Sequence, residues 1–151
     1  MVASLGHTPF CVLVLAATEA CVVVFGGENG VRVALINTVS IGLAFLVSHV
    51  FKLLVFRLRP HDDLPDVMPL IKAPDKYSFP SSHAAGTFCT ATSIGFFYRE
   101  VIPLVFLIAF TISISRFIAR LHYPSDILAG AMIGTSVALA VSCISQLVLF
   151  G

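Results

Sequence analysis

The sequence predicts an all-α membrane protein, a polytopic bundle of about five transmembrane helices in one domain covering residues 1–151. Hydrophobic residues make up 58% of the chain and charged residues 11%, whereas soluble domains average roughly 45–50% and about 25%. The apolar residues also form uncharged runs long enough to cross a bilayer. The net charge of +1 argues against a nucleic-acid-binding protein, which needs concentrated positive charge.

The first two predicted spans cover about residues 9–25 and 31–57, separated by a glycine-rich turn at 26–30. No Lys or Arg precedes Arg32, so the positive start of a cleaved signal peptide is missing and a retained span is predicted. Glu19 lies inside the first span, where a charge costs roughly 2.5–3.5 kcal/mol. We therefore expect Glu19 to be protonated or paired across the bundle.

The remaining spans are predicted at about 82–98, 101–118 and 124–149. A serine just before the apolar run of the third span is a good helix N-cap. Pro103 suits the first turn of the fourth span, and Pro124 suits the first position of the last. The third and fourth spans are short for helices that face lipid.

The charged residues are concentrated in two of the breaks between spans. Nine of the seventeen lie between Lys52 and Lys76, and three more, Arg116, Arg120 and Asp126, flank the break before the last span. If the spans alternate in direction, both breaks and the stretch Pro80–His83 face the same side of the membrane. Lysines and arginines at helix ends either reach toward lipid headgroups or bind an anion, and spacing alone leaves both explanations open.

The first motif is KLLVFRLRP, from Lys52 to Pro60. Lys52 and Arg59 are seven residues apart, so on one helix they would share a face and could bind the same anion. Pro60 is predicted to end that helix. Arg57 falls on a different face and is predicted to reach toward the headgroups.

The second motif is PSSH, from Pro80 to His83. The first turn of a helix offers unpaired N–H groups and the positive end of the helix dipole, both of which favour phosphate. Helix capping alone also explains this motif.

The third motif is SRFIARLHYPSD, from Ser115 to Asp126. A helix starting near Tyr123 places His122 just before it and Asp126 in its first turn. Asp126 could then accept a hydrogen bond from one ring nitrogen of His122, which would make the other nitrogen nucleophilic.

Together the motifs offer two histidines, an orienting carboxylate, three cations and helix N-termini. This set suits phosphoryl transfer without a metal, since cations cover the phosphoryl oxygens while one imidazole attacks and the other protonates the leaving group. The acidic residues Asp62, Asp63 and Asp66 share one loop and offer no convincing magnesium site.

At these residues the sequence resembles the type 2 phosphatidic acid phosphatases, the PAP2 superfamily. The resemblance rests on a three-part signature, here carried by Lys52, Arg59 and Pro60, then Pro80, Ser81 and His83, then Ser115, Arg116, His122 and Asp126. Ser82 stands where the family usually has glycine. The family's membrane members usually have three spans before the first motif, whereas two are predicted here.

The resemblance implies a helical core shared with haloperoxidases, no metal and no other cofactor. It implies that His122 is the nucleophile, that Asp126 orients it, and that His83 protonates the leaving group. The phosphate would be held by Lys52, Arg59, Ser81, the backbone at Ser82, and Arg116.

The expected function is therefore a membrane lipid phosphatase, with polyprenyl (undecaprenyl) diphosphate as the favoured substrate. Phosphatidylglycerophosphate or phosphatidate is the alternative substrate, and a lipid-to-lipid phosphotransferase would use the same residues. A non-enzymatic alternative is a lipid-binding or transport protein with a relic site. By resemblance to bacterial members, the site is expected on the outer face of the plasma membrane. The apolar chain argues against a vanadium haloperoxidase.

Overall fold

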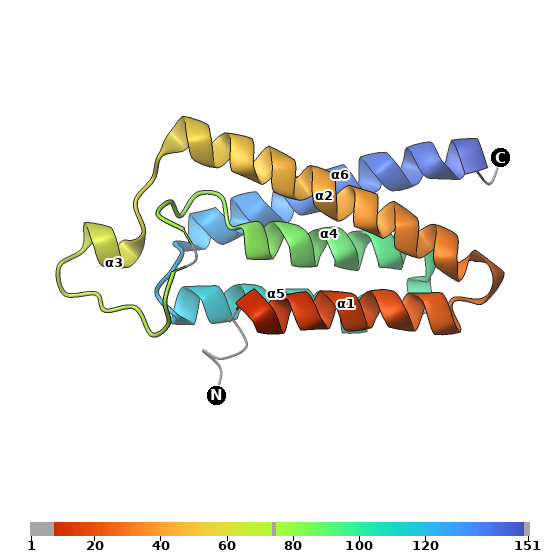
Figure 1. The fold of residues 1–151 in the computed structure, drawn as a ribbon, viewed down its shortest axis with the longest axis horizontal. Coiled ribbons are helices and arrows are strands. Elements are labelled where there is room, and N and C mark those ends of the chain that lie inside the picture. Colours follow the sequence, from red (N-terminus) through yellow and green to blue (C-terminus); the bar gives the residue numbers. More distant parts are fainter. Residues whose placement is uncertain (1–7, 74, 150–151) are drawn as a thin grey trace.

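The computed structural model describes residues 8–73 and 75–149, and this part of the chain folds as a bundle of helices (Figure 1). The long helices are α1 (Thr8–Phe25), α2 (Gly30–Val55), α4 (Ser82–Phe97), α5 (Ile102–Ile118) and α6 (Pro124–Leu149). Shorter elements are η2 (Gly27–Asn29), α3 (Pro60–Asp63) and η3 (Arg99–Val101). These long helices coincide with the five predicted spans.

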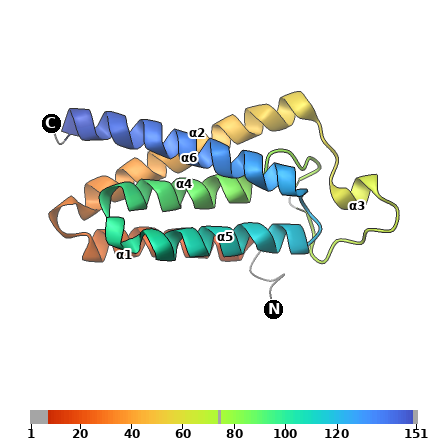
Figure 2. The same ribbon diagram turned by 180° about the vertical axis from the view of Figure 1, so that it is seen from behind.

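By length and composition, three segments of the described chain can cross a membrane: Gly27–Val55, Arg99–Ile118 and Pro124–Val148. The apolar part of α1, Cys11–Phe25, is shorter. Helix α4 has 16 residues, the shortest of the five long helices. It does not need to face lipid, because it lies at the centre of the bundle and packs against α1, α2, α5 and α6 (Figures 1 and 2).

Small side chains allow this central position. Between Ala84 and Gly95 nearly every residue of α4 is buried, and most are alanine, glycine, serine, threonine or cysteine. In a bilayer, where lipid tails are as apolar as leucine, helices associate by close backbone packing, which small residues permit.

Two glycines four residues apart set the closest approach, between α4 and α6. A Cβ atom added at Gly130 would lie 2.3 Å from the main-chain oxygen of Ser81, and one at Gly134 would lie 2.1 Å from that of Ala85. Either contact is far below van der Waals distance. Gly130 and Gly134 therefore fix the separation of the N-terminal halves of α4 and α6, from which several predicted site residues project.

We expect Gly134→Ala to lower the thermal transition of the detergent-solubilised protein, because the new methyl group has backbone in its way and the two helices must separate. Gly42→Ala is the matched control, since a Cβ there meets nothing within 4 Å. In a helix, alanine is favoured over glycine by up to about 1 kcal/mol, so Gly42→Ala should leave the transition unchanged or raise it slightly. Equal transitions for the two variants would contradict the close-packing account.

The predicted continuation of α2 to Arg57 is wrong. The helix ends at Val55, and Phe56 adopts a left-handed conformation (φ 54°) with its N–H bonded to the Lys52 carbonyl. The chain then runs extended: Leu58 pairs antiparallel with Tyr77, and the N–H of Ser78 donates to the Arg57 carbonyl at 2.8 Å. Long-range pairing thus replaces the last helical turn.

Arg59 accordingly lies beyond α2, and Pro60 begins α3 instead of ending the preceding helix. The prediction that Lys52 and Arg59 share one helical face is wrong in its geometry. They approach each other because the chain folds back after Phe56.

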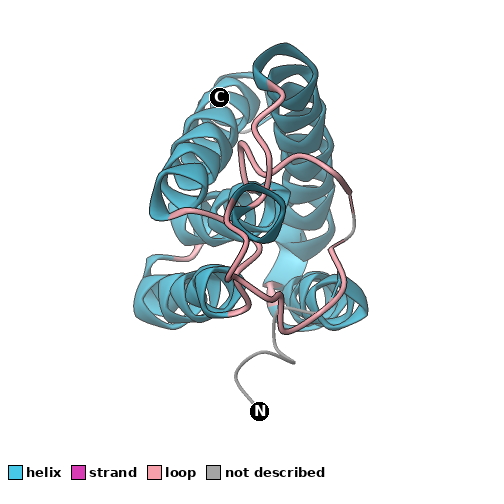
Figure 3. Ribbon diagram, turned by 90° about the vertical axis from the view of Figure 1, so that its left-hand side faces the viewer, coloured by secondary structure: helices cyan, strands magenta, loops and turns pink. Residues whose placement is uncertain are grey.

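The charge-rich segments do gather at one end of the bundle, as the alternation of spans predicts. That end carries α3, the start of α4 and the connection between α5 and α6 (Figures 1 and 3). The turns at Gly27–Asn29 and Arg99–Val101 lie at the opposite end. Within the bundle, Glu19 has a partner on another helix, since its Oε1 accepts a hydrogen bond of 2.7 Å from Asn37 Nδ2.

Candidate active site

A cavity of about 390 Å³ opens at the charged end, between α1, α2 and α4. Its polar lining comes from separate parts of the chain: His49, Lys52, Arg59, Asp75, Ser82, His83, Thr87 and His122. Its apolar lining includes Val12 and Leu15 of α1 and Phe45 of α2. The fold therefore brings five of the predicted site residues to one cavity whose other wall is hydrophobic.

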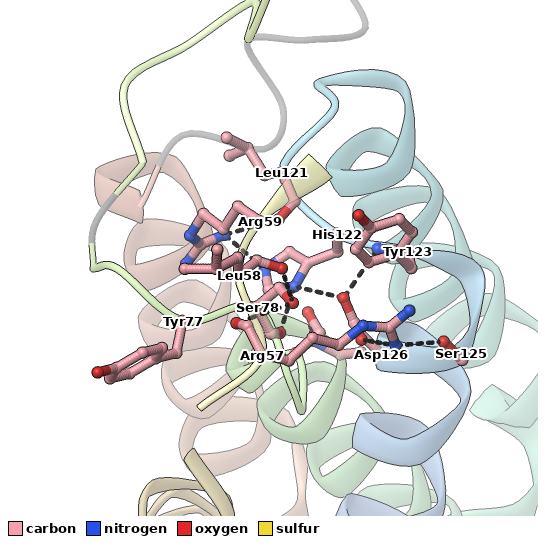
Figure 4. Close-up of polar contacts among 12 residues, drawn as sticks. Arg57, Leu58, Arg59, Tyr77, Ser78, Leu121, His122, Tyr123, Ser125 and Asp126 are labelled. Atoms are coloured by element: carbon pink, nitrogen blue, oxygen red, sulfur yellow. Dashed lines mark hydrogen bonds and ion pairs between the residues drawn. The ribbon is translucent and has the colours of Figure 1, made fainter. Parts of the chain in front are cut away.

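His122 lies in the connection before α6 and is 2% exposed. Its Nδ1 is 2.8 Å from the main-chain oxygen of Ser78 (Figure 4). A carbonyl oxygen can only accept, so Nδ1 carries the hydrogen, and Nε2 keeps its lone pair. Nε2 lies 3.3 Å from Nη1 of Arg59, which can only donate. The hydrogen-bond network thus assigns Nε2 as the basic nitrogen.

Asp126 lies in the first turn of α6, as predicted, and is fully buried. Its Oδ2 accepts a hydrogen bond of 2.8 Å from the Tyr123 N–H and lies 3.8 Å from Nδ1 of His122. The predicted hydrogen bond from His122 to Asp126 is therefore replaced by a longer contact, and the short hydrogen bond from Nδ1 goes to Ser78. The main-chain oxygen of Asp126 accepts from the Ser81 N–H at 3.0 Å, which ties the starts of α4 and α6 together.

The surroundings keep His122 neutral. Burial, opposed by Asp126 and assisted by the cations Arg59 and Arg116, lowers the pKa of His122 to about 4. At neutral pH Nε2 of the imidazole therefore has an unprotonated lone pair, as a nucleophile requires.

Asp75 occupies the position between two of the predicted phosphate-binding cations. Its Oδ2 is 2.7 Å from Lys52 Nζ, and its Oδ1 is 2.6 Å from Arg59 Nη2. Burial alone would raise the pKa of Asp75, but the hydrogen bonds and charges of Lys52 and Arg59 outweigh it and lower the pKa. An ionised carboxylate thus bridges the two cations, with its side chain 47% exposed.

Arg116 is 1% exposed, and within the described residues none of its three guanidinium nitrogens has a hydrogen-bond partner. Nε2 of His83 is likewise buried and unpaired there, and His83 lines the cavity. Buried polar groups are normally satisfied, and a buried unpaired cation is costly. His83 can therefore bond to a group that enters the cavity, whereas Arg116 lies outside the cavity lining and acts on the charge of His83 and His122 from behind it.

The serines divide between capping and lining. Ser81 is fully buried and is the N-cap of α4, its hydroxyl accepting from the Ala84 N–H at 3.5 Å. Ser82 begins the helix and lines the cavity. The N–H groups of a first helical turn have no acceptor within the helix, so α4 presents donors and its positive dipole end here. The capping prediction and the anion-binding prediction are therefore compatible.

Three residues that contact this site were not predicted as site residues. Asp75 is one of several aspartates in the long loop, and no spacing distinguishes it. Ser78 acts through its main-chain oxygen, which every residue type has, so the sequence does not mark this position. Arg57 was predicted to reach toward the headgroups, yet its Nη1 is 2.9 Å from Asp126 Oδ1. Asp63, the last residue of α3, accepts a hydrogen bond from the Tyr123 hydroxyl at 2.9 Å.

The model of the PAP2 superfamily matches residues 33–149 of the chain. Among curated proteins, decaprenylphosphoryl-5-phosphoribose phosphatase of Mycobacterium tuberculosis is 30% identical over 105 residues, which are 68% of this chain and 58% of that protein. Bacitracin transport permease protein BcrC of Bacillus licheniformis is 34% identical over 66% of this chain and 51% of its own length. Lipid A 4'-phosphatase of Bacteroides thetaiotaomicron is 33% identical over 68% and 51%.

Among solved structures, the transmembrane PAP2-type phosphatidylglycerolphosphate phosphatase of Bacillus subtilis has the same fold, with a TM-score of 0.73 and 23% identity. The match covers 97% of this chain and 74% of that structure.

The fold and the site define a helical membrane protein with a buried histidine and cation cluster at one end of the bundle. The chain belongs to the PAP2 superfamily. It spans about half the length of the curated relatives it matches.

Proposed function

We propose that this chain is a metal-independent membrane lipid phosphatase that hydrolyses a lipid phosphate or diphosphate through a phosphohistidine intermediate. The observation that carries the proposal is the cavity lined by Lys52, Arg59, His83 and His122, beside which the buried Arg116 guanidinium, unpaired among the described residues, acts on both histidines. Phosphate is the anion that several fixed cations and a helix N-terminus suit best.

The proposed reaction has two steps. Nε2 of His122 attacks the phosphorus, the bond to the leaving oxygen breaks, and His83, protonated when the substrate is bound, gives that oxygen its proton and becomes neutral. Water then attacks the phosphohistidine, His83 takes a proton from it, and cleavage of the P–N bond restores the imidazole and releases phosphate. The cations and the first turn of α4 stabilise the charge on the equatorial oxygens in both steps.

The apolar wall of the cavity supports a lipid substrate. Val12, Leu15 and Phe45 form a hydrophobic surface between α1, α2 and α4 that continues from the cations. A lipid tail would lie there while its phosphate reaches His122. We favour polyprenyl diphosphate, because one curated relative is named for a decaprenylphosphoryl compound. Phosphatidylglycerophosphate is the second candidate, because the structurally similar protein of Bacillus subtilis is a phosphatidylglycerolphosphate phosphatase.

The testing experiment measures phosphate release by the purified protein in detergent, with and without EDTA. The substrates are undecaprenyl diphosphate, phosphatidate and phosphatidylglycerophosphate. We expect phosphate to be released from at least one of these substrates, and the release to persist in EDTA. The ratio of the kcat/KM values ranks the substrates. Activity lost with EDTA would refute the metal-independent mechanism, and no release from any substrate would refute the phosphatase assignment.

We further propose that the charged end faces outward across a bacterial plasma membrane. Single cysteines placed in the 61–79 loop of a variant lacking the four natural cysteines should react with a membrane-impermeant maleimide in intact cells. Labelling only after the cells are opened would place the site inside.

Asp75 leads to a prediction about substrate affinity. Its carboxylate bridges Lys52 and Arg59, so a phosphate that binds these cations must displace it. Asp75→Asn removes the competing charge and should lower KM and the inhibition constant of inorganic phosphate by roughly three- to tenfold. Asp66→Asn, in the same loop and exposed, is the control and should change neither constant. A higher KM for Asp75→Asn would show that the carboxylate assists binding.

A further inference from the structure

Arg57 contacts the two groups that face Nδ1 of His122. Its side chain binds Asp126, and its main-chain carbonyl binds Ser78. After α2 ends at Val55, the chain turns Arg57 toward the start of α6. Its Nη1 lies 2.9 Å from Oδ1 of Asp126 and 2.8 Å from the Ser125 hydroxyl (Figure 4). Asp126 is fully buried, so this ion pair supplies a positive charge next to a carboxylate that water does not reach.

The guanidinium of Arg57 is itself held in place. It stacks on the Tyr123 ring, with the central carbon 4.0 Å from the ring centroid. The Tyr123 hydroxyl donates to Asp63 at 2.9 Å, which fixes the ring. A planar guanidinium that is stacked and hydrogen-bonded holds an orientation that a lysine cannot reproduce.

The backbone of the same residue completes a ring of contacts. The Arg57 carbonyl accepts from the Ser78 N–H at 2.8 Å, and the Ser78 carbonyl accepts from Nδ1 of His122 at 2.8 Å. On the other side, Arg57 binds Asp126, which lies 3.8 Å from the same Nδ1. Both groups that face Nδ1 are therefore attached to Arg57.

We propose that Arg57 is a positioning residue for His122, acting through Asp126 and the Ser78 carbonyl. The proposal rests on the proposed function, in which His122 is the nucleophile. Arg57 fixes the carboxylate so that Nδ1 keeps its hydrogen bond to Ser78, and Nε2 stays directed at Arg59 and the cavity. Its charge also offsets that of Asp126, which would otherwise favour the imidazolium form of His122.

The other groups that act on the charge of His122 come from every neighbouring element: Arg59 after α2, His83 of α4, Arg116 of α5 and Asp126 of α6. A substitution at Arg57 leaves Arg59, His83 and Arg116 in place and acts directly only on Asp126. A change in the titration of His122 can therefore be assigned to the lost cation and its effect on Asp126.

Arg57→Gln and Arg57→Lys separate charge from geometry. Because the cavity lining does not include Arg57, Arg57→Gln should lower kcat roughly 10- to 100-fold with little change in KM, as substitutions of residues that orient a ligand side chain do. Removing a positive charge makes protonation of His122 easier. The acid limb of kcat/KM, where His122 must be neutral, should therefore move to higher pH in Arg57→Gln.

Arg57→Lys keeps the charge but loses the stacked, fork-shaped geometry. It should lower kcat while leaving the acid limb at the wild-type pH. Arg99→Gln, an exposed arginine at the opposite end of the bundle, should behave as the wild type. An unchanged kcat and acid limb in Arg57→Gln would overturn the proposal, and a raised KM at unchanged kcat would instead make Arg57 a substrate-binding residue.

A readout that does not need activity keeps this proposal separate from the proposed function. The imidazole of His122 can be titrated by NMR in selectively labelled protein in detergent, assigned by comparison with His122→Gln. The expected result is a pKa raised in Arg57→Gln and unchanged in Arg57→Lys. No shift in either variant would overturn the positioning role even if the wild type hydrolyses lipid phosphates. If the wild type hydrolyses no lipid phosphate but the pKa of His122 still rises in Arg57→Gln, only the proposed function is refuted.

Discussion

His122→Ala is expected to reduce phosphate release by at least about 10⁴-fold, as loss of a covalent nucleophile does in other hydrolases. Alanine leaves water as the attacking group, without the positioned lone pair of Nε2. KM should change little, because the cations that hold the phosphate remain. The measurement is kcat for the preferred lipid substrate at saturating concentration in detergent.

His61→Ala is the matched control for this substitution. His61 lies at the same end of the molecule in α3, and the proposed reaction does not use it. It should retain wild-type turnover. A rapid acid-free quench with phosphorus-labelled substrate should also trap label on the wild type in a form stable to base and labile to acid, and no label on His122→Ala. Undiminished turnover of His122→Ala would remove the nucleophile assignment.

Arg116→Met is expected to have opposite effects on activity and stability. The guanidinium is buried, with all three nitrogens unpaired within the described residues. Replacing even a buried ion pair with apolar side chains of similar volume is often neutral or stabilising by about 1–4 kcal/mol, and a buried cation without a partner lacks the compensation of a pair. The thermal transition of the substrate-free protein should therefore rise. Loss of a fixed donor to the transferring phosphoryl group should lower kcat by about 10²–10³-fold.

Inorganic phosphate distinguishes a binding role from a structural one. It should raise the thermal transition of the wild type, since a ligand that binds the folded state stabilises it. It should have little effect on Arg116→Met. Arg99→Met, which removes an exposed arginine at the far end of the bundle, should leave transition and activity unchanged. A lower thermal transition for Arg116→Met would mean that Arg116 stabilises the fold and does not serve to bind an anion.

Sequence patterns predicted the helices because their boundaries depend on local chemistry. Pro124 begins α6, Ser81 caps α4, and the glycine-rich turn separates α1 from α2. Each of these signals acts within a few residues. The end of α2 was predicted two residues late because the competing contacts of Arg57 and Leu58 come from residues 77–78, about twenty positions away.

The prediction of the site shows the same limit. His83, His122, Lys52 and Arg59 could be assigned to one cavity, since charge concentration and alternating spans place their segments at one end. Their partners could not be assigned. The sequence suggested that Asp126 accepts a hydrogen bond from His122, whereas Nδ1 donates to a main-chain carbonyl. It also gave no reason to place Asp75 between two cations.

The sequence by itself determined that this protein belongs in a membrane, where its five helices lie, and which residue types its site can use. Hydropathy and capping residues decide these features locally. Tertiary structure alone decided which atoms face each other. The Gly130 and Gly134 contacts set how closely α4 and α6 approach, and the turn at Phe56 brought Arg57 to Asp126. Such contacts join residues tens of positions apart, and their geometry follows from packing that no single segment encodes.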